Sequence, residues 1–325
     1  MPLFDLPLED LWRYAPEVDE PPDLDAFWER AIAAAHERQT EPVFTPHQPD
    51  TYGALAVDDV TYSGADGHPV HGWFLRPRDA TGPLACLVHF VGYGGGRGSP
   101  SEHALYPAAG FACLVMDTRA QGGWWTSGAT GDPGAGASGA EHPGVMTRGL
   151  LDPETYYYRR LYVDAVRAVE TAAAHPLVDP ARIAVGGGSQ GGALALAAAA
   201  LAPGQVRLCH ADVPFLCHFR RAIEITPNAP YTELTQWLAV HPEHVEQAYR
   251  TLAHVDNVNL ARRIRARCLL AVGLMDDICP PSTVFAAYNA ITAPKELVVH
   301  PYSGHQPPTT HFDRRLADFA GEMKG

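Results

Sequence analysis

The stretch that decides the fold of this chain reads Ala184-Val185-Gly186-Gly187-Gly188-Ser189-Gln190-Gly191-Gly192. The apolar run at 183–185 predicts a short buried strand, and the Ala/Leu-rich run at 193–201 predicts a helix. Between them lies Gly187-x-Ser189-x-Gly191, the nucleophile-elbow pattern, whose small residues allow a sharp turn that lifts the serine hydroxyl above the sheet. The pattern therefore predicts a nucleophilic Ser189, with the N-terminus of the following helix aimed at the reaction centre.

The bulk composition indicates a folded, acidic protein. The chain has 325 residues, of which 46% are hydrophobic and 19% charged, and its formal net charge is −13. Because like charges repel, this excess disfavours nucleic acid or an anionic membrane as a partner. The six cysteines are scattered without a CxxC pair, so we expect free thiols. The acidic N-terminus and the lack of a long apolar run predict neither a secretory signal nor a membrane span, and hence a cytoplasmic protein.

Short apolar runs alternate with helical stretches over most of the chain. This alternation is typical of an α/β fold, a mostly parallel sheet covered by helices on both faces. Before it, the runs at 57–62 and 70–75 flank a Gly/Asp-rich turn and predict a β-hairpin. The predicted core strands are 84–90, 111–116, 183–185, 206–211, 268–272 and 297–299, and the predicted helices are 24–37, 156–174, 193–201, 282–290 and 312–323.

We expect a single domain over residues 1–325, with two additions to it. Residues 1–50 are predicted to form an N-terminal extension that contains the helix at 24–37. Residues 213–262 are predicted to be an insertion between two core strands, with helical, aromatic-rich stretches at 214–223 and 231–252. An insertion at this point would lie over the C-terminal edge of the sheet and could shape a pocket there.

A serine hydroxyl becomes a good nucleophile only when a base takes its proton and an acid orients that base. In the α/β-hydrolase fold the order along the chain is Ser, Asp or Glu, then His, each after a strand. Asp276 and Asp277 follow the apolar run at 268–272, and we favour Asp276 because it comes first after the strand. Of the later histidines, we favour His305 on a Gly-flanked loop over His300 at a strand end and His311 at a helix start, which completes a predicted Ser189, Asp276, His305 triad.

Two backbone amides are predicted to stabilise the oxyanion of the tetrahedral intermediate. One is the N–H of Gln190, which follows the nucleophile. The other is the N–H of Tyr93, in the Gly-rich loop after the strand at 84–90, and Tyr93 is also expected to contact substrate. The alternative is that these glycines only make a flexible turn.

Two other kinds of site fit parts of the sequence. Gly186-x-Gly188-x-x-Gly191 matches the dinucleotide fingerprint, with Asp212 downstream as a ribose ligand, but this motif opens the α/β unit in dinucleotide-binding folds and here lies midway along the chain. His241 and His244 form the only tight histidine pair, which we interpret as a solvated helix start. With no HExxH motif and no Cys/His ligand set, we expect no metal and no cofactor.

Several longer motifs span nearly the whole chain. They are Phe4-Asp-Leu-Pro-Leu8, Asp25-x-Phe27-Trp28, Asp117-Thr-Arg-Ala-Gln-Gly122, Tyr156-Tyr-Tyr-Arg-Arg160 and the run from Gly273 to Asn289. With these motifs and Gly187-Gly-Ser-Gln-Gly191, the chain resembles carbohydrate esterase family 7, the acetyl xylan esterases and cephalosporin C deacetylases. The run from Gly273 is the most specific, since GxSxG alone fits many hydrolases.

The resemblance implies an α/β-hydrolase fold in which Ser189, Asp276 and His305 form the triad and the amides of Tyr93 and Gln190 form the oxyanion hole. It also implies an intracellular enzyme that needs no metal and forms a ring-like homohexamer. The substrates it implies are short acetylated xylo-oligosaccharides and cephalosporin C.

The chain departs from the family pattern at two positions. The family's Arg-Gly-Gln signature is Arg119-Ala120-Gln121 here, which is harmless unless position 120 needs a positive φ. The family's His-Glu pair is His305-Gln306, so any ion pair that the glutamate made, for example with Arg119, is expected to become a neutral hydrogen bond.

The sequence thus predicts a serine esterase that removes acetyl groups from small soluble compounds. The rival hypotheses are a hydrolase of amides, such as a peptidase, and a non-catalytic binding protein on the same fold. Aromatic residues that could contact substrate, although such residues are more often core, are Tyr93, Trp124, Trp125, Phe215, Phe219 and Trp237.

Overall fold

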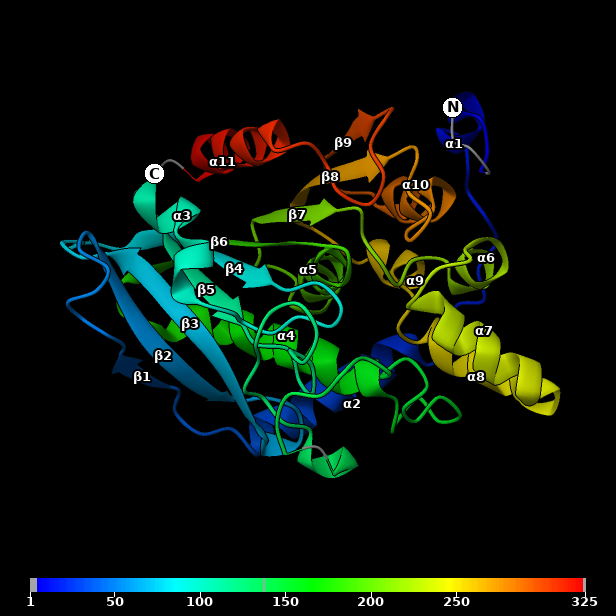
Figure 1. The fold of residues 1–325 in the computed structure, drawn as a ribbon, viewed down its shortest axis with the longest axis horizontal. Helices are drawn as coiled ribbons and strands as arrows, with labels where there is room; N and C mark the ends of the chain where they lie inside the picture. Colours follow the sequence, from blue (N-terminus) through cyan, green and yellow to red (C-terminus); the bar gives the residue numbers. More distant parts are fainter. Residues whose placement is uncertain (1–4, 137, 324–325) are drawn as a thin grey trace.

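The computed structural model describes residues 5–136 and 138–323. Phe4, the first residue of the Phe4–Leu8 motif, lies outside the described residues. Within them, nine strands form one sheet in the order β1-β2-β3-β5-β4-β6-β7-β8-β9 (Figure 1). β1, β2, β3 and β5 pair antiparallel in turn, whereas β5, β4, β6, β7, β8 and β9 pair parallel. The sheet is therefore mostly parallel with an antiparallel edge, which confirms the predicted α/β-hydrolase fold.

The strands are short, and most of the parallel ones are buried along nearly their whole length. Their bounds are β1 (Val43–Pro46), β2 (Leu55–Ser63), β3 (Pro69–Pro77), β4 (Leu84–Phe90), β5 (Ala112–Met116), β6 (Val178–Gly188), β7 (Leu208–Asp212), β8 (Arg267–Gly273) and β9 (Lys295–His300).

Eleven α-helices lie in the described residues. They are α1 (Leu8–Leu11), α2 (Leu24–Glu37), α3 (Leu105–Ala108), α4 (Tyr157–Ala174), α5 (Gln190–Leu201), α6 (Phe219–Ile225), α7 (Tyr231–Val240), α8 (Val245–Ala253), α9 (Asn257–Ala261), α10 (Pro281–Ala290) and α11 (Thr310–Glu322). None of the described helices combines the length and the apolar character needed to cross a bilayer.

The helices cover both faces of the sheet and bury a core on each. On one face the larger core joins the sheet to α2, α4, α5, α9 and α10. On the other face a smaller core forms between the sheet and α3 and α11, around Tyr106 and Phe319, whose rings lie 5.1 Å apart. Figure 1 shows α11 and α4 on opposite sides of the sheet. Strands buried from both sides explain the near-continuous apolar runs in the sequence.

Element bounds agree with the sequence where the pattern was strong. The helix at 24–37 and the strand at 84–90 are confirmed to the residue. The hairpin is also confirmed, since β2 and β3 pair from Ser63 with Pro69. β1 was not predicted, because its four residues are mostly exposed and carry no apolar pattern.

The insertion differs from the prediction in two places. Residues 214–218 are not helical, since Leu216 and His218 have φ of 55° and 48°, values that an α-helix excludes. The predicted helix at 231–252 is two helices, α7 and α8, separated by a 3₁₀ turn at Pro242–His244, because a proline ends a helix at the residues before it. Figure 1 shows α6, α7 and α8 projecting beyond the sheet at the end where α9 and α10 lie.

In the elbow between β6 and α5, some glycines leave no space for a side chain, whereas others do. A Cβ at Gly187 would lie 2.5 Å from the Phe90 carbonyl oxygen, and one at Gly191 would overlap the same oxygen. A Cβ at Gly188 would meet nothing within 4 Å. The turn therefore requires glycine at 187 and 191 because of close backbone approach.

The difference in packing at these two glycines predicts that Gly191→Ala lowers the free energy of unfolding more than Gly188→Ala does. Gly191→Ala should lower the free energy of unfolding by at least about 2 kcal/mol, because the methyl group meets rigid backbone. Gly188→Ala should change it by less than about 1 kcal/mol. Urea unfolding of both variants is the measurement, and equal stability of the two would contradict this account of the elbow.

Candidate active site

Ser189 occupies a strained position between β6 and α5. Its φ and ψ are 57° and −120°, a region that non-glycine residues rarely adopt. Three backbone hydrogen bonds hold it there: Ser189 N–H donates to the Asp212 carbonyl at 2.9 Å, and Ser189 O accepts from Ala193 and Phe215, both at 3.0 Å. The conformation is that of a nucleophile elbow, as the sequence predicts, and it places Ser189 directly before the N-terminus of α5.

The loops after β8 and β9 bring an aspartate and a histidine together. Met275 N–H donates to the Ser303 carbonyl at 2.9 Å, which fastens one loop to the other. Asp276 is fully buried, and its Oδ2 lies 2.9 Å from His305 Nδ1. Because an ionised carboxylate only accepts hydrogen bonds, Nδ1 carries the proton and Nε2 is left free to act as a base.

The other oxygen of Asp276 is also satisfied. Oδ1 accepts from the backbone N–H groups of Ile278 and Cys279, both at 2.9 Å, which fixes the carboxylate in its loop. Asp277, the alternative acid, is exposed. The structure thus brings Asp276 rather than Asp277 to His305.

The Ser189 hydroxyl is not hydrogen-bonded to His305 within residues 5–136 and 138–323. Its side chain lies beside the buried thiol of Cys279 instead. Burial raises the pKa of that thiol well above its usual value, and a hydrogen bond with Ser189 partly opposes this rise. In hydrolases without substrate the contact between nucleophile and base is often loose and tightens only when substrate binds.

The two predicted oxyanion donors lie on neighbouring segments with their amides available. Gln190 is the first residue of α5, where N–H groups have no partner inside the helix. Neither the backbone N–H of Gln190 nor that of Tyr93 donates a hydrogen bond to any other described residue. The N-terminal end of α5 adds a partial positive charge at the same place, which favours a developing anion.

The hydroxyl of Tyr93 has a structural role, and the substrate contact expected of this residue stays a prediction. Its hydroxyl donates to Glu233 Oε1 at 2.6 Å and accepts from the amides of Gly144 and Val145 at 3.1 and 3.2 Å. Glu233 belongs to α7 and also accepts from Met146 N–H at 3.2 Å. The phenol is thus fully engaged in joining the Gly-rich loop to the insertion. Burial, followed by the Glu233 charge, raises the pKa of Tyr93, so it stays protonated.

Gln121 connects the two segments that carry the oxyanion donors. Its Oε1 accepts from Gly94 N–H at 2.6 Å, and its Nε2 donates to Gln190 Oε1 at 2.9 Å. Tyr158 donates to the same Gln190 oxygen at 3.0 Å. All three side chains are buried. One glutamine therefore fixes the spacing between the residue after Tyr93 and the residue after the nucleophile.

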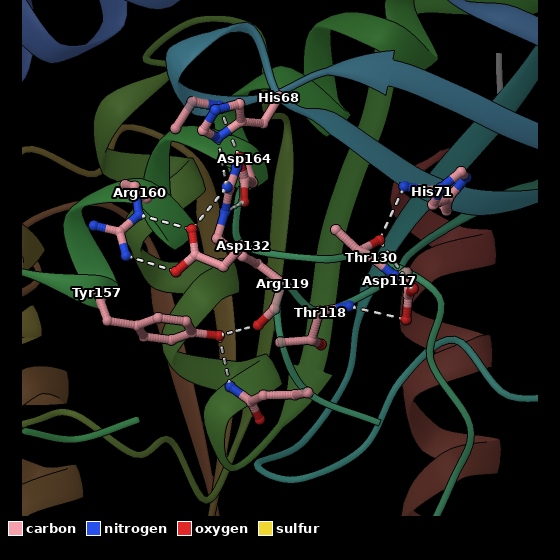
Figure 2. A network of polar contacts seen from close by, with 12 residues as sticks. His68, His71, Asp117, Thr118, Arg119, Thr130, Asp132, Tyr157, Arg160 and Asp164 are labelled. Atoms are coloured by element: carbon pink, nitrogen blue, oxygen red, sulfur yellow. Dashed lines mark hydrogen bonds and ion pairs between the residues drawn. The ribbon is translucent and has the colours of Figure 1, made fainter. Parts of the chain in front are cut away.

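Arg119 lies at the centre of a buried ionic network beneath this site. It forms a bidentate pair with Asp164, with both N–O distances 2.8 Å, and a third contact to Asp132 at 3.2 Å. Arg160 binds the other side of Asp132 at 2.6 Å (Figure 2). Figure 2 also shows the Tyr157 hydroxyl meeting the Arg119 carbonyl. Asp164 belongs to α4, so the network attaches the segment after β5 to that helix.

This network corrects the expectation for Gln306. Arg119 is fully buried and its guanidinium faces the two aspartates, whereas Gln306 is exposed on the surface. No hydrogen bond or ion pair joins Gln306 to Arg119 in the part of the chain that the structure describes. The suggested ion pair between a glutamate at 306 and Arg119 is therefore wrong for this fold.

Position 120 does need a positive φ. Ala120 is buried with φ of 52°, and its N–H donates to the Thr130 carbonyl at 2.9 Å. Alanine is therefore costly at this position, because the left-handed region costs an L-residue about 1–2 kcal/mol. The surrounding network holds the residue in place despite this cost.

A second buried aspartate–histidine pair was not identified from the sequence. His311, at the start of α11, lies 2.8 Å from Asp212 Oδ1, and Arg315 lies 2.6 Å from Asp212 Oδ2. Burial alone would raise the pKa of Asp212, but Arg315 and His311 together lower it. Asp212, the candidate ribose ligand, is therefore occupied by α11, and the sequence indicates only that His311 and Arg315 share one face of that helix.

The fold, the strained serine turn and the Asp276–His305 pair define an α/β-hydrolase. The family model for acetyl xylan esterase (AXE1) matches residues 1–323, so the chain belongs to the acetyl xylan esterase family, whose members are carboxylic ester hydrolases. An acetyl xylan esterase from a Paenibacillus species is similar in structure, with 41% identity, a TM-score of 0.89 and coverage of 97% of this chain and 99% of that one.

Two further relatives agree. Acetyl xylan esterase 1 from a Thermoanaerobacterium species shares 32% identity, with a TM-score of 0.88 and coverage of 99% of this chain and 100% of that one. The acetyl esterase Axe7A of Xylanibacter ruminicola is 31% identical over 89% of this chain. This chain spans 64% of the length of that esterase.

The geometry at position 120 predicts that a smaller residue changes the stability little and that a β-branched residue lowers it. Ala120→Gly should change the free energy of unfolding by no more than about 1 kcal/mol, because relief of the left-handed conformation is offset by greater freedom of the unfolded chain. Ala120→Val should lower it by about 2 kcal/mol or more, since a β-branched residue is strained at positive φ and overfills a buried site. Denaturant unfolding measures both, and a valine variant as stable as the parent chain would contradict the assigned conformation.

Proposed function

We propose that the chain is a serine esterase that hydrolyses acetyl esters through an acetyl-enzyme intermediate. The observation that carries this proposal is the pairing of His305 Nδ1 with the buried carboxylate of Asp276 in the same fold as the strained turn at Ser189. Family membership supports the ester chemistry. The available amides of Tyr93 and Gln190 support the acyl-transfer route.

In the first half-reaction Ser189 Oγ attacks the acetyl carbonyl carbon while His305 Nε2 accepts the hydroxyl proton. Asp276 holds the imidazole in the tautomer this step needs and stabilises the positive charge that forms on it. The negative charge on the carbonyl oxygen is taken by the amides of Tyr93 and Gln190 and by the N-terminus of α5. Collapse of the intermediate returns the proton from His305 to the departing alcohol.

In the second half-reaction water replaces the alcohol. His305 Nε2 takes a proton from the water, whose oxygen attacks the acetyl carbon bound to Ser189. The same amides stabilise the second oxyanion, and the proton passes to Ser189 Oγ as acetate leaves. The cycle restores the enzyme with one ester bond hydrolysed.

The substrate class rests on the relatives and the resemblance. The similar proteins are named acetyl xylan esterases and an acetyl esterase, and we extend that substrate class, short acetylated xylo-oligosaccharides, to this chain. Cephalosporin C is an acetyl ester of comparable size and belongs to the same proposal. The homohexamer, the cytoplasmic location and the single-domain organisation stay predictions.

The proposal predicts a steep dependence of rate on acyl length. Hydrolysis of p-nitrophenyl acetate should be saturable, and kcat/KM should fall at least about tenfold from the acetyl to the hexanoyl ester, because an esterase selective for acetyl groups discriminates against added methylenes. Ser189→Ala should lower kcat by at least about 10³-fold, because the covalent route is lost.

The matched control is Ser303→Ala, a serine on the histidine loop whose side chain has no assigned role. That variant should keep activity within about threefold, since only peripheral contacts change. A Ser189→Ala variant that retains most of its activity would contradict the nucleophile. Faster turnover of an acetyl amide than of the acetyl ester would instead favour the amide hydrolase.

A further inference from the structure

Two tryptophans lie exposed on one short segment after β5. Trp124 is 62% exposed and Trp125 is 55% exposed, although large aromatic side chains are usually mostly buried. Trp124 lies near His142, with ring centroids 6.5 Å apart. Adjacent exposed aromatic rings on an otherwise well-packed protein mark a site of contact with a ligand or a partner.

The segment that carries these tryptophans, residues 122–128, is fastened at both ends. Gly128 N–H donates to the Gly122 carbonyl at 3.2 Å, which closes the segment on itself. Immediately after it, Asp117 Oδ2 accepts from the backbone amides of Ala129 and Thr130 at 2.6 and 2.8 Å. Figure 2 shows Asp117 and Thr130 side by side at this junction. The tryptophans thus project from an ordered segment.

The same segment is attached to the Gly-rich loop that carries the oxyanion donor. Gly96 N–H donates to the Thr126 carbonyl at 3.2 Å, and Gly98 N–H donates to the Ser127 carbonyl at 2.9 Å. Thr126 Oγ1 donates to the Gly96 carbonyl at 2.9 Å. The 122–128 segment and the Gly-rich loop therefore behave as one rigid unit.

Trp125 is fixed against the Gly-rich loop that carries Tyr93. Its indole Nε1 donates to the carbonyl of Tyr93 at 2.8 Å. Its ring lies against the Cα atoms of Gly92 and Gly95, where a Cβ on Gly92 would be 3.4 Å from Trp125 Cζ2 and 3.8 Å from the Gly188 carbonyl oxygen. Gly92 thus lies between the Trp125 ring and Gly188, the residue before Ser189, and Trp125 has a hydrogen-bonded indole with more than half its surface exposed.

We infer that Trp125, assisted by Trp124, is the platform on which the sugar ring of an acetylated saccharide stacks during deacetylation. The inference rests on the proposed function and concerns the alcohol portion of the substrate, which the triad does not contact. With the acetyl group between Ser189 and the oxyanion amides, the alcohol portion must extend away from that point. A pyranose has an apolar C–H face that a flat, immobile aromatic ring can cover, and covering it removes apolar area from water.

The experiment compares two substrates that differ in the presence of a sugar. Trp125→Ala should raise KM for di-O-acetyl methyl β-xyloside by about tenfold, the effect expected from losing roughly 50 Å² of apolar contact. For p-nitrophenyl acetate, which carries no sugar ring, the loss of kcat/KM should be no larger than the loss in Trp125→Phe, which also lacks the hydrogen bond to the Tyr93 carbonyl. Trp125→Phe, which keeps a ring but loses the hydrogen bond to Tyr93 O, should recover most of the affinity for the sugar ester.

Trp12→Ala is the matched control, since Trp12, the residue directly after α1, is 44% exposed and packs against Phe285. It should leave the ratio between the two substrates unchanged. An equal loss on both substrates in Trp125→Ala would overturn the inference and leave Trp125 as a support of the oxyanion loop. No loss on either would overturn it as well. If the parent chain fails to hydrolyse p-nitrophenyl acetate, the proposed function itself is wrong, an outcome distinct from both.

Discussion

The site depends on the strained backbone of Ser189. A non-glycine residue in this conformation costs about 1–3 kcal/mol, so it persists only where the surroundings impose it. The Asp212 carbonyl holds the serine amide from β7, and the close approach of Gly191 to the Phe90 carbonyl packs α5 against β4. Strands on both sides of β6 therefore fix the nucleophile, and the sheet order that makes them neighbours is a requirement of the site.

The proposed oxyanion donors depend on a second constraint, the buried polar network around residues 117–121. Gln121 spans from Gly94 to Gln190, and Arg119 ties the same segment to Asp164 on α4. Removing one partner of a buried ion pair typically costs about 3–5 kcal/mol, because the other charge is left uncompensated. The network thus fixes the distance between the segments that carry Tyr93 and Gln190. The proposed donors are then in position before substrate binds. The positive φ of Ala120 is a strained conformation that the packing of this segment imposes.

Hydrophobic periodicity and the order of the motifs predict much of the fold and of the candidate site. The core strands, most helices, the elbow and the choice of Asp276 and His305 followed from apolar runs and from the order of polar residues after strands. What the sequence could not predict was the set of partners that depend on three-dimensional packing. The pairing of His311 with Asp212 joins residues 99 positions apart, and the engagement of the Tyr93 hydroxyl by Glu233 joins residues 140 apart. Residues 214–218 are not part of the predicted helix because two of them have positive φ values, which no local sequence pattern indicates.

Covalent labelling tests whether the fold makes Ser189 an activated nucleophile. A fluorophosphonate reacts with a serine only when a base and an oxyanion hole assist it. We expect one phosphonate per chain, mapped to Ser189 by mass spectrometry of the peptides, with no adduct in Ser189→Ala. An unlabelled parent chain, or an adduct on a different residue, would contradict it.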